Sequence, residues 1–358
     1  MLHFTRNIES VNFDLNRTNK LIISIGDSFT YGDSAWDDEL ILKYPPQYIN
    51  YKIGYENYDK GTLKIINEMY PNTTYFQNGI LNFELMFQSN CFSSLLFNKL
   101  NNEWTVLNLG VKARGNFSAV SSLFLTDVDW EKVKELIVIY MPSSMNRVDM
   151  INDNLYLDEN MVVQNFFVTA WPSSESTRLF RESNEVVSKN HGPNTSPWNL
   201  FQDSIHDAVW STKYEIHKTI LEFQFLQNFV DSKNGRLFVI PAFSKEYNKD
   251  YFYKEINQNV IRNPITRELV DIQDITPKSD YLNKLVGKIK WEKFHYPENK
   301  PSFYHYALSQ SEPYENVDML NLIGRFSKDN WIMPCGHPSA KSHKLISNYI
   351  LNIINKIF

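Results

Sequence analysis

A serine near the amino terminus and a histidine near the carboxyl terminus are the residues most able to do chemistry in this chain of 358 residues. Ser28 follows an apolar run, residues 21–25, and His337 precedes a carboxyl-terminal apolar segment. A serine hydroxyl is a weak nucleophile at neutral pH, and an imidazole can accept its proton during attack and return it to the leaving group. Ser28 is therefore a candidate nucleophile that needs such a partner.

Residues 21–25 predict a strand that ends in a turn around Ser28. The run is short, β-branched and nearly continuous, as expected for a strand buried on both faces of a parallel sheet. Open α/β sheets bind ligands just beyond the carboxyl ends of such strands. Gly26 and Gly32 bracket the turn, and Asp27 has a carboxylate suited to accepting hydrogen bonds from its amides. A simpler interpretation, a strand followed by a turn and a helix cap, uses the same residues.

The sequence Gly-Asp-Ser-Phe-Thr-Tyr-Gly at residues 26–32 resembles the first signature block of the GDSL/SGNH hydrolase superfamily. The resemblance makes Ser28 the nucleophile. Residues 105–118 are similar to the second block, a strand followed by a loop whose glycine N–H helps to form an oxyanion hole. The matching residue is Gly115, and Gly110 is its nearest rival. Such donors must already point to the position where negative charge develops.

The third block of the family is matched only in part. Residues 135–141 predict a buried strand, but Met-Pro-Ser-Ser-Met-Asn-Arg replaces the Gly-x-Asn-Asp of the family. The resemblance places the oxyanion asparagine at Ser143, and Asn146 is the nearby amide side chain. Either side chain can donate a hydrogen bond, so both are candidates beside the backbone N–H groups of Ser28 and Gly115.

The last block contains the general base. Residues 331–343 resemble the histidine-containing ending of the family, which makes His337 the base. The aspartate that the family has three residues before this histidine is Pro334 here. Three explanations stay open: a backbone carbonyl orients the imidazole in a Ser-His dyad, Asp329 folds back to it, or catalysis has been lost. Absence of the acid can cost orders of magnitude in rate.

The remaining histidines give weaker signals. Cys335, His337 and His343 offer three metal ligands at most, without a second Cys-x-x-Cys pair or a His-Glu-x-x-His segment. We therefore expect no metal and no organic cofactor, and interpret His343 as a helix-capping or surface residue. His295 and His305 lie among aromatic residues that could line a sugar-binding surface, although such clusters more often serve packing.

The elements that position these residues predict an α/β fold. The family resemblance implies a flavodoxin-like three-layer α/β/α sandwich with a mostly parallel central sheet. Because no Pro/Gly/Ser-rich linker divides the chain, we expect one domain, residues 1–358, whose long insertions build the substrate cleft. The insertions are expected at about residues 33–88, 148–197 and 244–329. Strands are predicted at residues 21–25, 105–109, 135–141 and 236–241, and helices at residues 92–100, 203–230 and 344–357. The helix at residues 203–230 is expected to have a broad apolar face, which includes Ile216, Ile220, Leu221, Phe223 and Phe225.

Charge and composition exclude several classes of partner. The chain has 36 basic and 41 acidic residues, a net charge of −5, and no basic stripe, so we expect no nucleic acid. No apolar run approaches the ~18 residues of a membrane span, and the amino terminus lacks a signal-peptide stretch. We therefore expect a soluble, cytoplasmic or virion-associated protein without a membrane partner. The two cysteines fit reduced thiols.

Together these features predict a serine esterase of SGNH type that removes small acyl groups, such as acetyl, from a carbohydrate. The abundance of Asn, Lys, Ile and Tyr and the His-Pro-Ser-Ala-Lys-Ser-His ending are similar to SGNH proteins of tailed bacteriophages. That similarity implies a polysaccharide or small-molecule ester as substrate, and assembly into a virion or a homo-oligomer. Two alternatives stay open: a non-catalytic binding or virion structural protein with this fold, and an esterase for lipids or thioesters.

Overall fold

The protein is described here from a computed structural model. The described residues are 2–4, 18–32, 35, 76–77, 80–81, 83–100, 103–110, 115–126, 128–145, 148–151, 156–157, 163–164, 167–170, 212–257, 260–262, 269–271, 280–310, 331 and 337–357.

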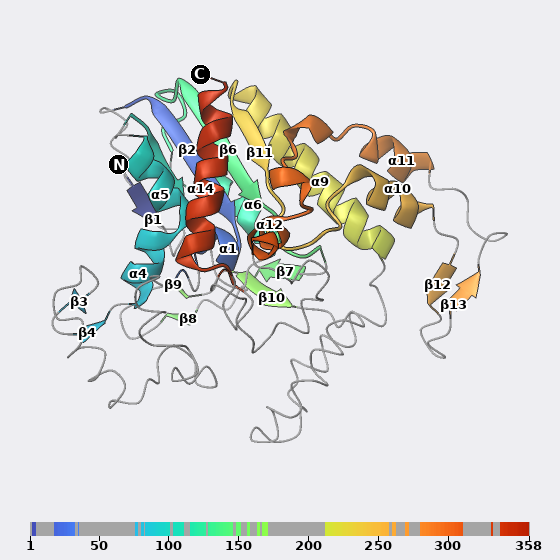
Figure 1. Cartoon of the computed structure of the whole chain (residues 1–358). Helices are drawn as coiled ribbons and strands as arrows, with labels where there is room; N and C mark the ends of the chain where they lie inside the picture. Colours follow the sequence, from blue (N-terminus) through green and yellow to red (C-terminus); the bar gives the residue numbers. More distant parts are fainter. Residues whose placement is uncertain are drawn as a thin grey trace, which may run out of the picture.

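A five-stranded sheet in the order β1-β5-β2-β6-β11 lies at the centre of the fold (Figure 1). Every neighbouring pair in it is parallel, which confirms the expected α/β class. All four predicted strands are present with ends within two residues of those expected, whereas β1 was not predicted. The strands are β1 (Leu2–Phe4), β2 (Lys20–Gly26), β5 (Thr105–Asn108), β6 (Glu135–Met141) and β11 (Arg236–Val239).

The carboxyl end of β2 lies at a switch point, where the chain stops adding strands on one side of β2 and begins to add them on the other. Of the strands that follow β1 in the chain, β2 comes first, and β5 and β6 lie on either side of it in the sheet. The connection after β2 therefore leads to one side and the connection after β5 returns to the other side. Such a switch point leaves a crevice beyond the strand ends, where open α/β sheets bind ligands.

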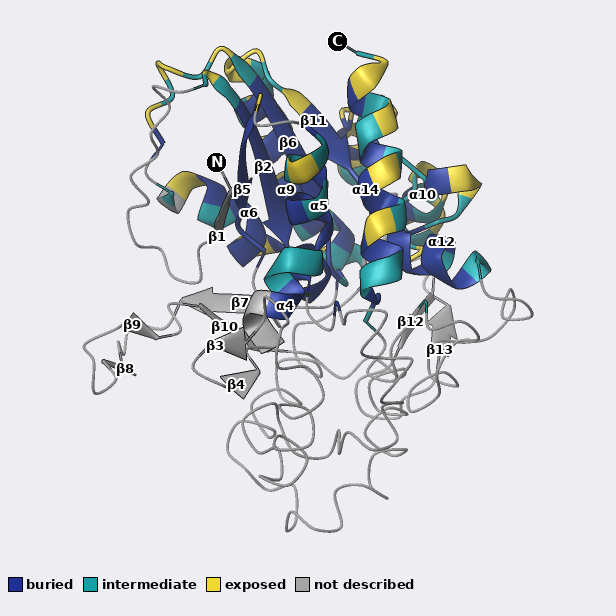
Figure 2. Ribbon diagram, turned by 60° about the vertical axis from the view of Figure 1, so that its left-hand side comes forward, coloured by how far each residue is buried: buried dark blue, intermediate teal, exposed yellow. Residues whose placement is uncertain are grey.

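Helices cover both faces of the sheet and bury two separate cores. Successive strand residues point to opposite faces, so Leu21 and Ile23 of β2 belong to the first core and Ile22 to the second. The strands β2, β5, β6 and β11 are accordingly buried except at the first residue of β2, β6 and β11, and most exposed residues lie in loops and on outer helix faces (Figure 2). Helices with residues in the first core are α6 (Asn116–Leu125), α9 (Thr212–Ser232), α10 (Lys249–Ile256) and α11 (Asp280–Val286). Those with residues in the second core are α5 (Phe92–Lys99), α12 (Phe303–Ser309) and α14 (Ala340–Asn355).

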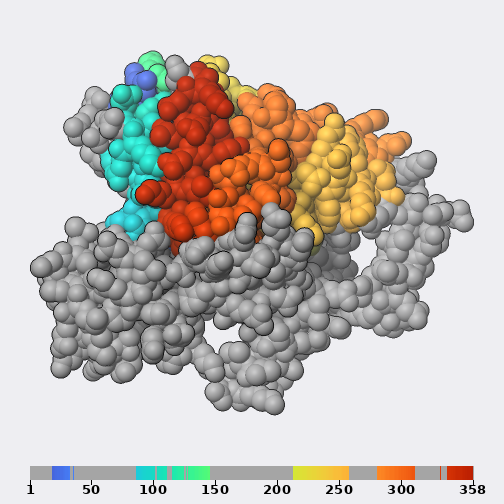
Figure 3. All heavy atoms as spheres, in the orientation of Figure 1, coloured from blue at the N-terminus to red at the C-terminus, as the bar shows by residue number. Residues whose placement is uncertain are grey.

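The carboxyl-terminal helix α14 packs between α5 and α12 (Figure 3). It begins four residues before the predicted start, with Ser339 as its N-cap. Along α14 the buried side chains Ile346, Ile350 and Ile354 recur at every fourth position, which is the spacing of one helix face. The predicted helix is confirmed, and its earlier start places His343 in its first turns.

The buried face of the long helix α9 is narrower than the apolar face expected from the sequence. Ile216, Ile220 and Phe223 are buried, as expected of its apolar face. Leu221 and Phe225, which the same interpretation placed on that face, are 46% and 57% exposed. Residues 203–211 of the predicted helix, which include His206, lie outside the described residues.

Much of the third expected insertion belongs to the two cores. Phe252 and Val286 lie in the first core and Phe303 in the second. The aromatic side chains considered for a sugar-binding surface include four that are buried: Phe294, Phe303, Tyr304 and Tyr306. These four rings are core packing.

The remaining elements are short. None of the described helices is long and apolar enough to cross a membrane. The elements are α1 (Ser28–Tyr31), α4 (Phe83–Asn90), the 3₁₀ turns Trp291–Lys293 and Pro297–Asn299, and four antiparallel strand pairs: β3 (Phe76–Gln77) with β4 (Ile80–Leu81), β7 (Val148–Ile151) with β10 (Phe167–Ala170), β8 (Tyr156–Leu157) with β9 (Val163–Gln164), and β12 (Val260–Arg262) with β13 (Leu269–Asp271).

Candidate active site

Ser28 is the first residue of α1, a helix of four residues that directly follows β2. The Asp27 carboxylate accepts a hydrogen bond of 3.0 Å from the N–H of Phe29, so the predicted turn role of Asp27 is confirmed. At the other end, Gly32 has the left-handed backbone (φ 90°) of a helix C-cap, and its N–H donates to the Ser28 carbonyl at 3.0 Å. Ser28 is thereby fixed at the carboxyl edge of the sheet, where it is 4% exposed.

No side chain fits at the exit of β2. Gly26 has φ 156°, and a Cβ atom there would lie 2.6 Å from the Met141 carbonyl oxygen. A Cβ atom on Gly32 would lie 2.3 Å from the Cβ of Cys91. The two glycines that bracket Ser28 are therefore required both by backbone conformation and by the close approach of neighbouring chain.

Ser28 and His337 are in hydrogen-bonding contact. The His337 Nε2 and Ser28 Oγ atoms lie 2.8 Å apart, although 309 residues separate them in the chain. This distance is within the range expected for a nucleophile and its base. The His337 ring packs on Phe29, with ring centroids 5.3 Å apart, and Phe29 stacks in turn on Phe243 at 5.5 Å. The two residues singled out from the sequence are thus brought together at the switch point.

The segment that carries His337 is anchored to Trp331. The Ser339 N–H and the Ser342 hydroxyl both donate to the Trp331 carbonyl, at 3.0 and 2.6 Å. The Lys341 ammonium lies 4.1 Å from the centroid of the Trp331 ring, within the range of a cation–π contact. These contacts fix the start of α14, and with it the approach of His337 to Ser28.

His343 is a buried residue, so its interpretation as a surface residue is wrong. Its Nδ1 accepts a 3.3 Å hydrogen bond from the N–H of Phe92, the first residue of α5, which agrees with the alternative of a helix cap. The ring lies beside Phe92 and Phe303. Burial, with a smaller contribution from His337, lowers the pKa of His343 to about 3. His343 is therefore a neutral structural residue.

The two candidate glycines of the oxyanion hole have different environments. The Gly110 N–H donates to the Asn108 Oδ1 at 2.9 Å, and a Cβ atom on Gly110 would lie 2.4 Å from the backbone nitrogen of Tyr31. Gly110 therefore permits close packing against α1, and its N–H is engaged there. Gly115 is the N-cap of α6 with an extended backbone, and its carbonyl accepts from the N–H of Ala119. Gly115 remains the candidate donor.

Asn108 is a site residue that the sequence analysis missed. Its Nδ2 donates to the Thr30 carbonyl at 2.9 Å, while its Oδ1 accepts from Gly110. One side chain thus ties the end of β5 to α1. The only signal in the sequence was an asparagine within the predicted strand 105–109, immediately before Leu-Gly.

Ser143 is held by its backbone. Its N–H donates to the Asn116 Oδ1 at 2.7 Å, and its carbonyl accepts from the Tyr247 hydroxyl. The Ser143 hydroxyl is buried and has no hydrogen-bond partner among the described residues. Neither Asn116 nor Tyr247 was singled out from the sequence. Asn146, Asp329, Pro334 and Cys335 lie outside the described residues, so the alternatives that involve them stay predictions.

Neither the cysteine nor the acidic side chains of the described residues suggest another chemistry. Cys91 is a free, buried thiol, and burial raises its pKa, which keeps it protonated. No group of three or more His, Cys, Asp or Glu side chains suited to a metal ion occurs within the described part of the chain.

Comparison of the chain with protein-family models, with curated proteins and with solved structures found no match. The resemblance of the sequence blocks to SGNH hydrolases therefore stays a prediction.

The close packing of Gly110 against α1 predicts a specific cost for Gly110→Ala. The added methyl would lie 2.4 Å from the Tyr31 nitrogen and 2.7 Å from the Thr30 carbonyl carbon, both backbone atoms. We expect the free energy of unfolding in urea to fall by about 2 kcal/mol, as in overpacked cores. Gly287→Ala is the control, because its nearest atom is 3.5 Å away, and should change stability by about 0.5 kcal/mol at most. Equal losses in the two variants would contradict this account.

The low pKa of His343 predicts a loss of stability in weak acid. The unfolded chain takes up a proton on this residue as the pH falls through about 6.5, whereas the folded chain does so only near pH 3. Between pH 6.5 and 5 this difference destabilises the folded state by about 2 kcal/mol. In His343→Asn, whose Oδ1 can still accept from Phe92, we expect the pH-dependent loss to be smaller by that amount. Urea unfolding at both pH values tests this, and identical pH dependence in the two proteins would refute it.

Proposed function

We propose that the protein is a serine ester hydrolase that forms an acyl-enzyme at Ser28. The observation that carries the proposal is the 2.8 Å contact between Ser28 Oγ and His337 Nε2 at the switch point of the sheet. An unassisted serine hydroxyl is a poor nucleophile, and a neighbouring imidazole is the usual means of activating it. The resemblance of the surrounding sequence blocks to SGNH hydrolases points to the same chemistry.

In the proposed reaction, Ser28 Oγ attacks the carbonyl carbon of the ester while His337 Nε2 accepts the hydroxyl proton. The tetrahedral intermediate carries a negative charge on the former carbonyl oxygen. The N–H groups of Ser28 and Gly115 and the hydroxyl of Ser143 are the proposed donors to that oxygen, with Asn146 as an alternative to Ser143. His337 then gives its proton to the leaving alcohol. Water, deprotonated by His337, attacks the acyl-enzyme, and His337 returns that proton to Ser28 Oγ as the carboxylic acid leaves.

The substrate we propose is a small acyl group, such as acetyl, on a carbohydrate. This narrower part of the proposal rests on the family resemblance. An esterase for lipids or thioesters would use the same two residues and would differ in its preference for chain length. We propose no metal or organic cofactor, because the Ser-His reaction needs none.

We expect purified protein to hydrolyse p-nitrophenyl acetate, and Ser28→Ala and His337→Ala each to lower the rate about 10³-fold or more, as in other serine hydrolases. Ser232→Ala, an exposed position at the end of α9, is the matched control and should keep full activity. Rates with acetyl, butyryl and octanoyl esters should fall with chain length, whereas a lipid esterase would show the reverse.

Hydrolysis that survives both substitutions would reject the assignment of Ser28 and His337. A wild-type protein that hydrolyses no ester and is not labelled at Ser28 by a fluorophosphonate would favour the alternative of a non-catalytic protein with this fold. The observation that favours a non-catalytic protein is the replacement of the expected aspartate by Pro334.

A further inference from the structure

We propose that Asn116 and Tyr247 are positioning residues, which hold Ser143 and the Gly115–Asn116 peptide in one fixed arrangement around the oxyanion. The inference rests on the ester hydrolysis proposed above. It adds two residues that do not touch the reacting atoms and that no sequence block singled out.

Asn116, Tyr247 and Ser143 form a closed ring of three hydrogen bonds. The Ser143 N–H donates to Asn116 Oδ1 at 2.7 Å, Asn116 Nδ2 donates to the Tyr247 hydroxyl at 2.8 Å, and that hydroxyl donates to the Ser143 carbonyl. Reversing the Asn116 amide would turn its NH₂ group toward another donor, so the ring allows only this orientation. Each of the three residues is at most 1% exposed. In such surroundings an unpaired polar group is costly, which favours the closed ring over any open form.

The ring spans the strand that carries Ser28. Gly115 and Asn116 follow β5, Ser143 follows β6, and in the sheet β2 lies between these two strands. Gly26 of β2 is paired with Met141 of β6, so Ser28 and Ser143 each lie two residues beyond the same paired position. The Asn116 side chain therefore joins the loops on either side of Ser28.

Of the polar groups of Ser143, the ring leaves only the hydroxyl available to a ligand. Both backbone polar groups of Ser143 are taken up by Asn116 and Tyr247. Its hydroxyl has no hydrogen-bond partner in the described part of the chain. A buried hydroxyl on a fixed backbone, with no partner among the described residues, is suited to stabilising charge that develops only in the transition state.

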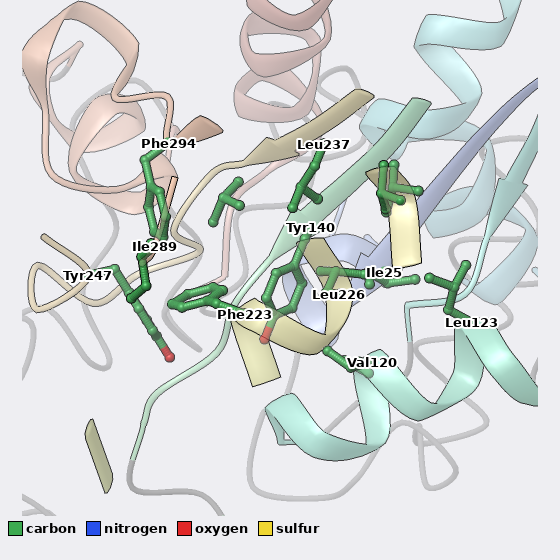
Figure 4. Close-up of a cluster of buried hydrophobic side chains, with 14 of the residues drawn as sticks. Ile25, Val120, Leu123, Tyr140, Phe223, Leu226, Leu237, Tyr247, Ile289 and Phe294 are labelled. Carbon is green, nitrogen blue, oxygen red and sulfur yellow. The ribbon is translucent and has the colours of Figure 1, made fainter. Parts of the chain in front are cut away.

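Tyr247 anchors the ring to the core. Its aromatic side chain is fully buried beside Phe223 and Ile289 (Figure 4), with its centroid 5.9 Å from that of Phe223. Burial raises the pKa of Tyr247 well above its usual value, and the nearby carboxylates of Glu222, Glu246 and Asp27 raise it further. The hydroxyl therefore keeps its proton and can donate to Ser143 at any pH at which the protein is assayed.

The test uses the full chain and p-nitrophenyl acetate. We expect Ser143→Ala to lower kcat about 10- to 100-fold with little change in KM, because the lost donor acts mainly in the transition state. Its stability in urea should equal or exceed that of the wild type, since the substitution removes a buried hydroxyl without a partner. A loss of kcat without a loss of stability is a result that a merely structural role would not give.

Tyr247→Phe opens the ring without changing the shape of the side chain, and Asn116→Ala is a second way to open it. We expect either variant to lower kcat about 10-fold or more at nearly constant KM. When either is combined with Ser143→Ala, the fold loss of kcat should be smaller than the product of the two single fold losses. Tyr296→Phe is the matched control, because it removes a hydroxyl that donates to the Tyr247 carbonyl at 2.6 Å and leaves the ring intact. This control should lose stability and keep kcat.

Two results would overturn the inference. One is a kcat for Tyr247→Phe and Asn116→Ala no lower than that of Tyr296→Phe. The other is a double variant whose loss equals the product of the single losses, since Tyr247 would then act independently of Ser143. Failure of the underlying function is distinguishable, because it would appear in the wild type as absence of turnover that depends on Ser28.

Discussion

The candidate site depends on a helix that cannot exist by itself. A helix of four residues is far below the length that is stable in water, so α1 forms only where its surroundings hold it. Asp27 binds its first turn, Asn108 binds the Thr30 carbonyl, and the Phe29 ring is buried in the second core. Gly110 brings the loop after β5 into backbone contact with α1. The position of the Ser28 hydroxyl is therefore a property of the packed sheet and its loops.

The same dependence explains how the two ends of the chain meet. His337 is held through α14, and α14 packs on α5, the helix that precedes β5. His343 joins these helices through the N–H of Phe92, and the Lys99 ammonium joins them again through Asn348 at 2.6 Å. Only a neutral imidazole can accept at His343 Nδ1, and burial keeps it neutral. The second core thus sets the separation of nucleophile and base by packing as well as by their own hydrogen bond.

The sequence predicted those parts of the fold and site that depend on local signals. The runs that became β2 and β6 are continuous and apolar, and Ser28 and His337 stand in recognisable short blocks. The hydrogen bonds that join Ser143 to Asn116 and Tyr247 had no local signal, although Ser143 itself was a candidate. The bonded residues are 27, 131 and 104 positions apart in the chain, and each residue type is common in loops. The burial of His343 and the exposure of Phe225 were missed for a related reason. Which side of a helix is covered depends on its neighbours, and periodicity alone does not determine them.

The replacement of the expected aspartate by Pro334 raises the question of how much the proposed reaction would depend on the base and how much on the oxyanion donors. In serine hydrolases the acid orients the imidazole, and a substantial rate enhancement persists without it through the oxyanion hole and substrate binding. The oxyanion donors therefore matter whether or not an acid orients His337, and they must already be in place when charge develops. The hydrogen bonds that fix Ser143 lie in a buried, low-dielectric region, where an oriented dipole stabilises charge more strongly than in water. The ring of Asn116, Tyr247 and Ser143 is therefore where the proposed hydrolase would stabilise the oxyanion, whichever group orients the base.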